Sequence, residues 1–126
     1  MKENELIVST LGKTWLFDLD GTLVKHNGHL EDGYDTLLDG VKEFFASISN
    51  KDKVIILTSR NREFNNKTEE FLTSNGIRFD HIIYDLPYGE RILINDQKPS
   101  GLRTAVAINI KRDSPFIVEF SEDTTL

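Results

Sequence analysis

The sequence predicts a single α/β domain with a mainly parallel sheet, and two observations support this fold class. Short apolar runs alternate with amphipathic or polar stretches, which is the pattern of strands joined by helices. Some of these runs, such as residues 54–57, are apolar at every position, as is typical of strands buried on both faces. A chain of 126 residues can bury one hydrophobic core, so we expect residues 1–126 to form one domain.

The individual elements follow from periodicity and from turn residues. Val41, Phe44, Phe45 and Ile48 have helical spacing, and a second helical pattern over residues 65–75 is followed by Gly76, a typical helix stop. Apolar runs predict an edge strand at residues 6–9 and core or further strands at residues 13–18, 54–57, 82–84, 92–94 and 105–110. Residues 116–120 read as a last strand or an ordered arm, before an acidic C-terminal tail that we expect to be flexible.

Composition excludes several classes of function. The net charge is −6 and the chain contains no basic block, which argues against nucleic-acid binding. Without cysteine, disulfides, thiolate metal sites and cysteine nucleophiles are excluded. The N-terminal residues carry mixed charge and no long apolar run follows, so we expect neither a secretory signal nor a membrane span, and a cytoplasmic location.

Two acids end the first core strand. Trp15, Leu16 and Phe17 are bulky and apolar, and Asp18 and Asp20 follow them, separated by one leucine. In extended chain, residues i and i+2 point to the same side, so both carboxylates should project from the strand end while Leu19 turns inward. Such a pair repels itself unless it binds a cation or keeps a proton, which makes this turn the first candidate site.

Later strands end in polar residues as well. Thr58 and Ser59 follow the second core strand, and Asn95 and Asp96 follow the apolar run at residues 92–94, with Lys98 close behind. The carboxyl ends of parallel strands meet at one edge of a sheet, so these side chains should converge. Carboxylate and amide oxygens favour Mg²⁺, and a carboxylate nucleophile, a second acid, a divalent cation and a lysine together suit phosphoryl transfer.

The residues from Asp18 to Thr22, Asp-Leu-Asp-Gly-Thr after an apolar strand, resemble the first motif of the haloacid dehalogenase superfamily. Thr58 and Asp96 are similar to its second and fourth motifs, so the resemblance spans roughly residues 15–104. It implies a Rossmann-like, doubly wound, mainly parallel sheet and a magnesium-dependent phosphatase, a phosphomonoester hydrolase that works through an aspartyl-phosphate. Asp18 would be the nucleophile, and Asp20 the general acid and base.

The resemblance also implies the other site residues. Catalytic roles would belong to Asp18, Asp20, Thr58 and Lys98, Mg²⁺ ligation to Asp18, Asp20, Asn95 and Asp96, and phosphate binding to Gly21, Thr22, Thr58, Ser59 and Lys98. Two positions depart from the superfamily. Where the superfamily has a lysine in a Lys-Pro pair, this chain has Leu86. We therefore expect Lys98 to take the place of that lysine, with Arg60, Lys67 and Arg91 as weaker candidates. Where the fourth motif has two acids, this chain has an amide and an acid, Asn95 and Asp96, which should weaken Mg²⁺ binding.

The spacing of the motifs leaves no room for a cap domain. The intervals between Thr22, Thr58 and Asp96 are each filled by a helix and a loop, and residues 24–33 match the superfamily's short flap. Capless relatives resemble enzymes for large phosphoesters, or enzymes in which a second subunit of a homo-oligomer supplies the lid. The stretch around residues 92–101 looks like that of proteins of carbohydrate or capsule metabolism, so we expect a phosphorylated small molecule, a sugar phosphate or another carbohydrate-linked phosphate, as the substrate.

Two alternatives stay open. A phosphorylation receiver or phosphate-sensing binding module has a similar sheet, but receivers carry the phosphorylated aspartate on a later strand, where this chain has Thr58. A catalytically weak or inactive regulatory or binding relative would fit the absent lysine at Leu86 and the amide at Asn95. Hydrolysis of a phosphomonoester separates the enzyme from both alternatives.

Overall fold

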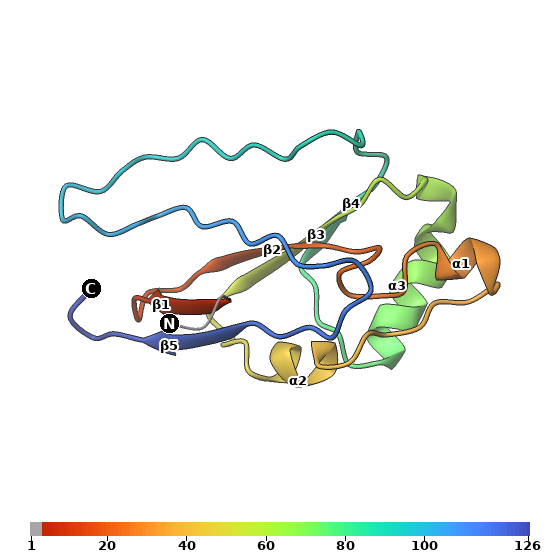
Figure 1. The fold of residues 1–126 in the computed structure, drawn as a ribbon, viewed down its shortest axis with the longest axis horizontal. Coiled ribbons are helices and arrows are strands. Elements are labelled where there is room, and N and C mark those ends of the chain that lie inside the picture. Colours follow the sequence, from red (N-terminus) through yellow and green to blue (C-terminus); the bar gives the residue numbers. More distant parts are fainter. Residues whose placement is uncertain (1–3) are drawn as a thin grey trace.

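The structure, a computed structural model, describes residues 4–126 and is a mixed α/β domain with parallel strands in two open sheets (Figure 1). Residues 1–3, on which the expectation of no leader partly depends, lie outside the described residues. In chain order the elements are β1 (Glu5–Val8), β2 (Thr14–Asp18), α1 (Gly28–Glu31), α2 (Val41–Ala46), β3 (Lys53–Leu57), the 3₁₀ turn η1 (Arg62–Phe64), α3 (Asn65–Ser74), β4 (His81–Ile83) and β5 (Glu119–Glu122).

The central sheet has the strand order β2-β3-β4, and both pairings are parallel. Its register places Asp18 beside Leu57, and Leu57 beside Ile83. Because the three strands run the same way, the turns that follow Asp18, Leu57 and Ile83 share one edge of the sheet. This edge is where the sequence predicts the functional residues.

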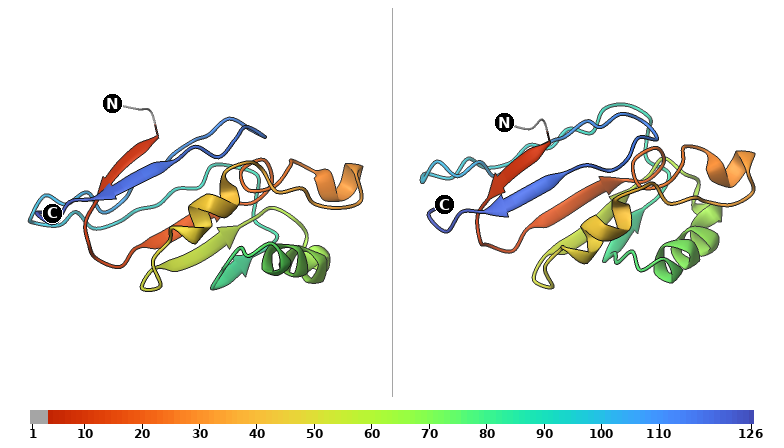
Figure 2. Two further views of the ribbon diagram at one scale, coloured as in Figure 1. Left: turned by 90° about the horizontal axis from the view of Figure 1, so that it is seen from below. Right: turned by 60° about the horizontal axis from the view of Figure 1, so that its bottom comes forward.

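Helices α2 and α3 lie on the same side of the central sheet, and aromatic packing fills the space between (Figures 1 and 2). Phe17 of β2 is buried against Phe44 and Phe45 of α2, and the rings of Phe17 and Phe45 are 4.6 Å apart. Leu72 of α3 belongs to the same cluster and is completely buried. Alternation along β2 sends Phe17 into this core, whereas its neighbour Leu16 points to the opposite face and is half exposed.

The second sheet pairs β1 with β5 in parallel, with Leu6 beside Phe120. Phe120 contacts Trp15 and Phe44, so this small sheet packs against the end of the main core. The acidic segment predicted as a flexible tail therefore begins inside a strand. Glu122 ends β5, and Asp123 is fixed by its amide, which donates to the Val8 carbonyl at 2.8 Å.

Most predicted elements are confirmed to within one or two residues at their ends. The strands predicted at residues 6–9, 13–18, 54–57 and 82–84 correspond to β1, β2, β3 and β4, and the two predicted helices correspond to α2 and α3. Gly76 follows α3 with φ of 74°, the left-handed conformation expected of a glycine at a helix stop. The flap at residues 24–33 contains one short helical segment, α1, which the sequence did not predict.

The prediction of strands at residues 92–94 and 105–110 is wrong. Residues 89–112, here called the arm, are described without any helix or strand and form a long excursion that leaves the domain and returns (Figure 1). The apolar run predicts burial, but a strand also needs a neighbouring backbone to pair with, and the arm pairs with none of the five described strands.

None of the helices described in residues 4–126 has the length and apolar composition of a membrane span.

Candidate functional site

A tight turn after β2 sets up the site. Leu19 is almost completely buried, and its carbonyl accepts hydrogen bonds from the amides of Leu23 and Val24 at 2.9 and 3.2 Å. Gly21 has φ of 85°, a conformation that side chains rarely allow, and an added Cβ would lie 3.1 Å from Arg112 Cγ. With Leu19 anchored inward, Asp18 and Asp20 lie outside the core on either side of it, as predicted.

Asp18 is the accessible acid of the pair. Its Oδ2 accepts a hydrogen bond from Thr22 Oγ1 at 3.0 Å, and its Oδ1 lies 2.8 Å from Arg91 Nη1. The Asp18 side chain is 39% exposed and that of Arg91 is 36% exposed. Asp18 therefore has a fixed orientation, a cation beside it and a path to solvent, which are the properties required of a reactive carboxylate.

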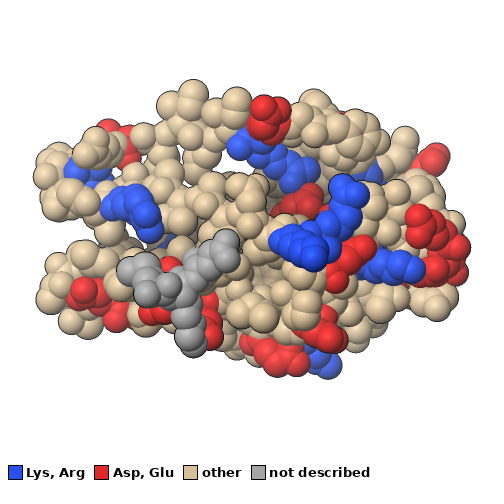
Figure 3. All heavy atoms as spheres, viewed as in Figure 1, with Lys and Arg blue, Asp and Glu red and all other residues tan. Residues whose placement is uncertain are grey.

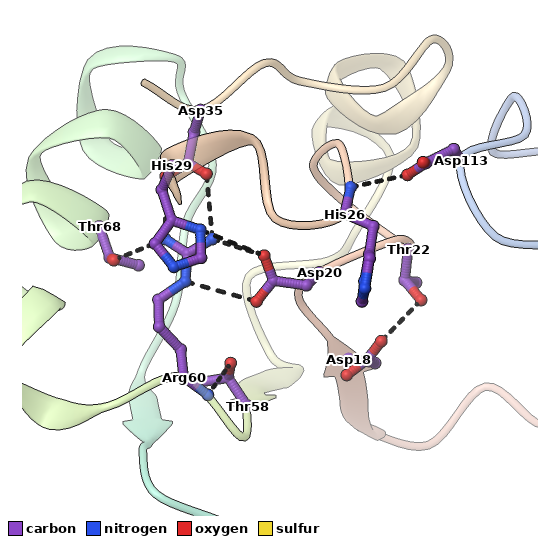
Figure 4. Close-up of polar contacts among 10 residues, drawn as sticks. All are labelled: Asp18, Asp20, Thr22, His26, His29, Asp35, Thr58, Arg60, Thr68 and Asp113. Carbon is purple, nitrogen blue, oxygen red and sulfur yellow. Dashed lines mark hydrogen bonds and ion pairs between the residues drawn. The ribbon is translucent and has the colours of Figure 1, made fainter. Parts of the chain in front are cut away.

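Asp20 faces a different neighbour (Figure 4). Arg60 Nη2 donates to Asp20 Oδ1 at 2.7 Å, and Arg60 Nε donates to Oδ2 at 3.4 Å. Figure 4 shows the Asp20 carboxylate turned toward Arg60 and His29, while the Asp18 carboxylate turns toward Thr22. The two acids therefore do not share one cation, although they leave the same strand end.

Arg60 is the centre of a buried ionic network. Its side chain is only 1% exposed and donates two hydrogen bonds to Asp35, at 2.9 and 3.0 Å, and one to Thr68 Oγ1 at 2.8 Å. Burial opposes the charge on the guanidinium, but the hydrogen bonds that Arg60 donates to Asp35 and Asp20 more than offset this and raise the pKa of Arg60. The network links the β2 turn, the segment after the flap, the end of β3 and helix α3.

Two flap histidines approach this network. His29 Nδ1 lies 3.7 Å from Asp20 Oδ1, and its ring packs edge-on against Phe64. Burial, and next the charge of Arg60, lower the pKa of His29, so its imidazole is neutral at neutral pH. The His26 amide donates to Asp113 Oδ1 at 2.7 Å, which fixes the flap to the segment that follows the arm.

Asp20, His29 and Asp35 have ligand atoms within 4.8 Å of one another, a spacing that could hold a metal ion. The guanidinium of Arg60, however, already donates to both carboxylates. A metal ion there would have to displace a buried positive charge and would leave it without partners. The two carboxylates fit Arg60 better than they fit a metal ion.

Thr58 and Ser59 lie at the predicted edge but make structural contacts. Thr58 is buried, and its Oγ1 accepts from the Arg60 amide at 3.0 Å. Ser59 Oγ donates to the carbonyl of Pro87 at 3.2 Å. Both hydroxyls hold the turn after β3 in the conformation that places Arg60 in its network.

The structure does not bring the fourth-motif residues to Asp18. Asn95, Asp96 and Lys98 are exposed on the arm, where Asn95 Nδ2 donates to the Thr104 carbonyl and Thr104 Oγ1 donates to the Asp96 carbonyl. Among the described side chains, Asp18 has polar contacts with Thr22 and Arg91 but not with Lys98. Lys67, another weaker candidate, is exposed on α3.

Sequence reasoning missed part of the network. The sequence predicts Arg60 only as a substitute for the missing lysine, although its place directly after Thr58 and Ser59, at a strand end, is a signal for a role in the site. Asp35 and Thr68 gave no signal, because neither lies at a strand end or in a motif. Their contacts depend on how the flap and α3 pack against the sheet.

Searches for relatives found no match for this chain among protein-family models, curated proteins or solved structures. The superfamily resemblance of residues 18–22 therefore stays a prediction from the sequence. The observed geometry around Asp18, Asp20 and Arg60 supplies the physical grounds for a functional proposal.

Removing Arg60 should strongly destabilise the domain. Arg60→Met would leave Asp20 and Asp35 partly buried without their cation, so we expect a loss of about 3–5 kcal/mol in the free energy of unfolding. Urea denaturation followed by circular dichroism measures this loss. Arg62→Met is the matched control, because that side chain is 76% exposed, and it should stay within about 0.5 kcal/mol of wild type. Equal losses in the two variants would contradict a structural role for the network.

His29 should make stability depend on pH. Its pKa is lowered in the folded state, so below the ordinary value of about 6.5 the unfolded chain takes up a proton that the folded chain resists. This contribution is complete above that pH and is lost as the pH falls through the lower pKa of the folded state. Urea denaturation between about pH 7.5 and 5.5 should show a smaller loss for His29→Gln than for wild type. The control variant His81→Gln, at the exposed start of β4, should lose as much unfolding free energy over this pH range as wild type. Identical losses in all three proteins would refute the assignment to His29.

Proposed function

We propose that this chain is a magnesium-dependent phosphomonoester hydrolase in which Asp18 is the nucleophile and carries an aspartyl-phosphate. The observation that carries this proposal is the position and accessibility of the Asp18 carboxylate. Its carboxylate stands at the carboxyl end of a parallel strand, is oriented by Thr22 and remains accessible. A carboxylate placed in this way can attack phosphorus in line with a leaving oxygen that faces solvent.

Arg91 supplies the positive charge that the sequence led us to expect from Lys98. Its guanidinium lies 2.8 Å from the proposed nucleophile and is itself partly exposed. A guanidinium in this position can bind two oxygens of a phosphoryl group at once and draw it toward Asp18. In this proposal Arg91 binds the phosphoryl group, and Lys98 has no role beside Asp18.

Asp20 is the proposed acid and base. Arg60 holds its carboxylate in one orientation, and the side chain keeps an exposed fraction of 17%. An ionised carboxylate accepts hydrogen bonds, which suits it to receive a proton from a water molecule that attacks the aspartyl-phosphate. Donation of a proton to the leaving group would require Asp20 to be protonated while it remains bound to Arg60.

The donors near Asp18 suit Mg²⁺ in part. Mg²⁺ prefers oxygen ligands and is bound through one or two carboxylates together with waters and phosphate oxygens, so the accessible Asp18 carboxylate is a fitting ligand. The resemblance adds the backbone carbonyl of Asp20 as a second ligand. Bound there, Mg²⁺ would neutralise charge on the phosphoryl oxygens. Ligation by Asp96 and Asn95 stays a prediction, because both residues lie on the arm.

The substrate class is proposed from the resemblance alone. We retain a sugar phosphate or another carbohydrate-linked phosphate as the substrate. A doubly wound sheet without a cap stays a prediction from the resemblance, because α2 and α3 both lie on one face of the central sheet. Asp18 is accessible at the edge of an open sheet, which is compatible with a large phosphoester.

A second candidate function is that of a catalytically weak or inactive binding protein. The observation in its favour is the ion pair between Asp20 and Arg60, which holds the proposed general acid with a permanent positive charge. Such a protein would bind phosphate through Arg91 without turning it over. Binding of inorganic phosphate by wild type, in the absence of any hydrolysis, would identify it.

Replacement of Asp18 tests the proposed function. Wild type should hydrolyse para-nitrophenyl phosphate in the presence of Mg²⁺ but not of EDTA, and Asp18→Asn should lower kcat by about a thousandfold or more, because the nucleophile is lost. Asp39→Asn, an exposed acid before α2, is the matched control and should keep full activity. Absence of turnover by wild type across sugar phosphates, nucleotides and para-nitrophenyl phosphate would contradict the enzyme proposal.

Arg91 and Lys98 can be distinguished by their effects on substrate binding. Arg91→Ala should raise KM by about tenfold or more, since a charge-assisted bidentate contact to the phosphoryl group is lost, and Arg91→Lys should recover only part of it. Lys98→Ala should leave KM unchanged. A raised KM for Lys98→Ala together with a normal KM for Arg91→Ala would restore the assignment made from the sequence.

A further inference from the structure

The arm exposes a continuous apolar run. Ile92, Leu93 and Ile94 are 82%, 58% and 90% exposed, although two of them are β-branched residues that favour buried strands. Val106, on the returning half of the arm, is a further exposed large apolar residue. Exposed apolar runs of this kind mark surfaces that another protein covers.

Most of the described backbone of the arm has no backbone partner. Within residues 89–112, the described bonds between backbone groups comprise one turn contact, from the Gly101 amide to the Lys98 carbonyl at 2.9 Å. Of the described backbone groups, side chains of the arm bond only the carbonyls of Asp96 and Thr104 and the amide of Leu102. An extended segment with unpaired amides and carbonyls binds readily to another strand or sheet.

Figure 3 shows open gaps on the left side of the molecule, where the middle of the arm lies. The two ends of the arm contact the domain through Arg91, Ile110 and Arg112, so only its middle part is available for another chain.

The central sheet has a face that matches the arm. Helices α2 and α3 lie on one side of β2-β3-β4, and the arm passes on the other side (Figures 1 and 2). On that second face Leu16 and Ile83 are 48% and 46% exposed. Parallel sheets are normally covered on both faces, so this half-covered face is a second apolar surface in need of a partner.

Charge separates the arm from the rest of the chain. The arm, residues 89–112, contains five basic residues and two acidic residues, Glu90 and Asp96, so it carries +3. Its basic residues are Arg91, Lys98, Arg103, Lys111 and Arg112. The whole chain carries −6, so the residues outside the arm carry −9. A basic, apolar arm and an acidic domain with an open apolar sheet face are complementary, and one chain carries both.

We propose that two copies of this chain form a symmetric dimer in which the arm of each copy packs on the open sheet face of the other. A two-fold axis makes the exchange reciprocal, so both apolar surfaces of each copy are covered by the same contact. The run from Ile92 to Ile94 supplies the apolar contact, and Lys98 and Arg103 bring positive charge to the second copy, whose residues outside the arm carry net negative charge. This inference does not depend on the proposed catalytic function.

Light scattering coupled to size-exclusion chromatography tests the dimer on the full chain. Wild type in the micromolar range should show twice the mass of one chain, and the double variant Ile92→Glu, Ile94→Glu should show the mass of one. Both side chains are exposed in the single copy, so the circular dichroism spectrum of the variant should remain that of the folded protein. Leu30→Glu, an exposed apolar residue of α1 outside both surfaces, is the matched control and should remain dimeric.

Two further variants examine the acceptor surface and the charges. Ile83→Glu changes the sheet face and should abolish the dimer. The double variant Lys98→Glu, Arg103→Glu should raise the dissociation constant of the dimer by about tenfold, as measured by analytical ultracentrifugation. A wild-type chain with the mass of one copy, whether because it stays alone or because the arm folds back on its own sheet, would overturn the proposal. A dimer that survives the arm variant or Ile83→Glu would overturn it as well.

Discussion

The ion pairs of Arg60 with Asp20 and Asp35 are the interaction on which the rest of the site depends. A guanidinium with 1% exposure is tolerable only because two carboxylates and Thr68 accept its hydrogen bonds, and the cost of burying it is recovered only if all of them stay in place. The partners come from separate segments of the chain. Arg60 therefore makes the turn after β2 a rigid part of the domain. If that turn moved, the buried charge of Arg60 would be exposed or would lose a partner.

This arrangement gives the two acids of the opening motif different tasks. Asp20 is held by Arg60, whereas Asp18 keeps an accessible carboxylate whose hydrogen bonds with described side chains are those to Thr22 and Arg91. Repulsion between neighbouring carboxylates is relieved by two separate guanidinium groups rather than by one shared cation. The proposed chemistry follows from the division: a reactive group needs access and orientation, and a proton acceptor needs to be held in place.

The sequence was sufficient for the features that depend on local pattern. The apolar runs predicted β2 and β3, Gly76 predicted the end of α3, and the order of Asp18, Leu19 and Asp20 predicted which side chains leave the core. The Arg60 network was not predictable, because its partners Asp35 and Thr68 meet only after the flap and α3 have packed. The strand prediction for residues 92–94 is wrong for a different reason. Their apolar character predicts burial, but it does not say whether the surface that buries them belongs to the same chain or to another one.

We propose that Asp18, and not Asp20, is the acid that reacts with phosphorus. The most direct measurement is to react wild type with a phosphate ester or acetyl phosphate in the presence of Mg²⁺, reduce any acyl phosphate with borohydride, and locate the modified residue by peptide mass spectrometry. We expect the modification on Asp18 and none on Asp20. Modification of Asp20, or of an acid outside the β2 turn, would contradict it.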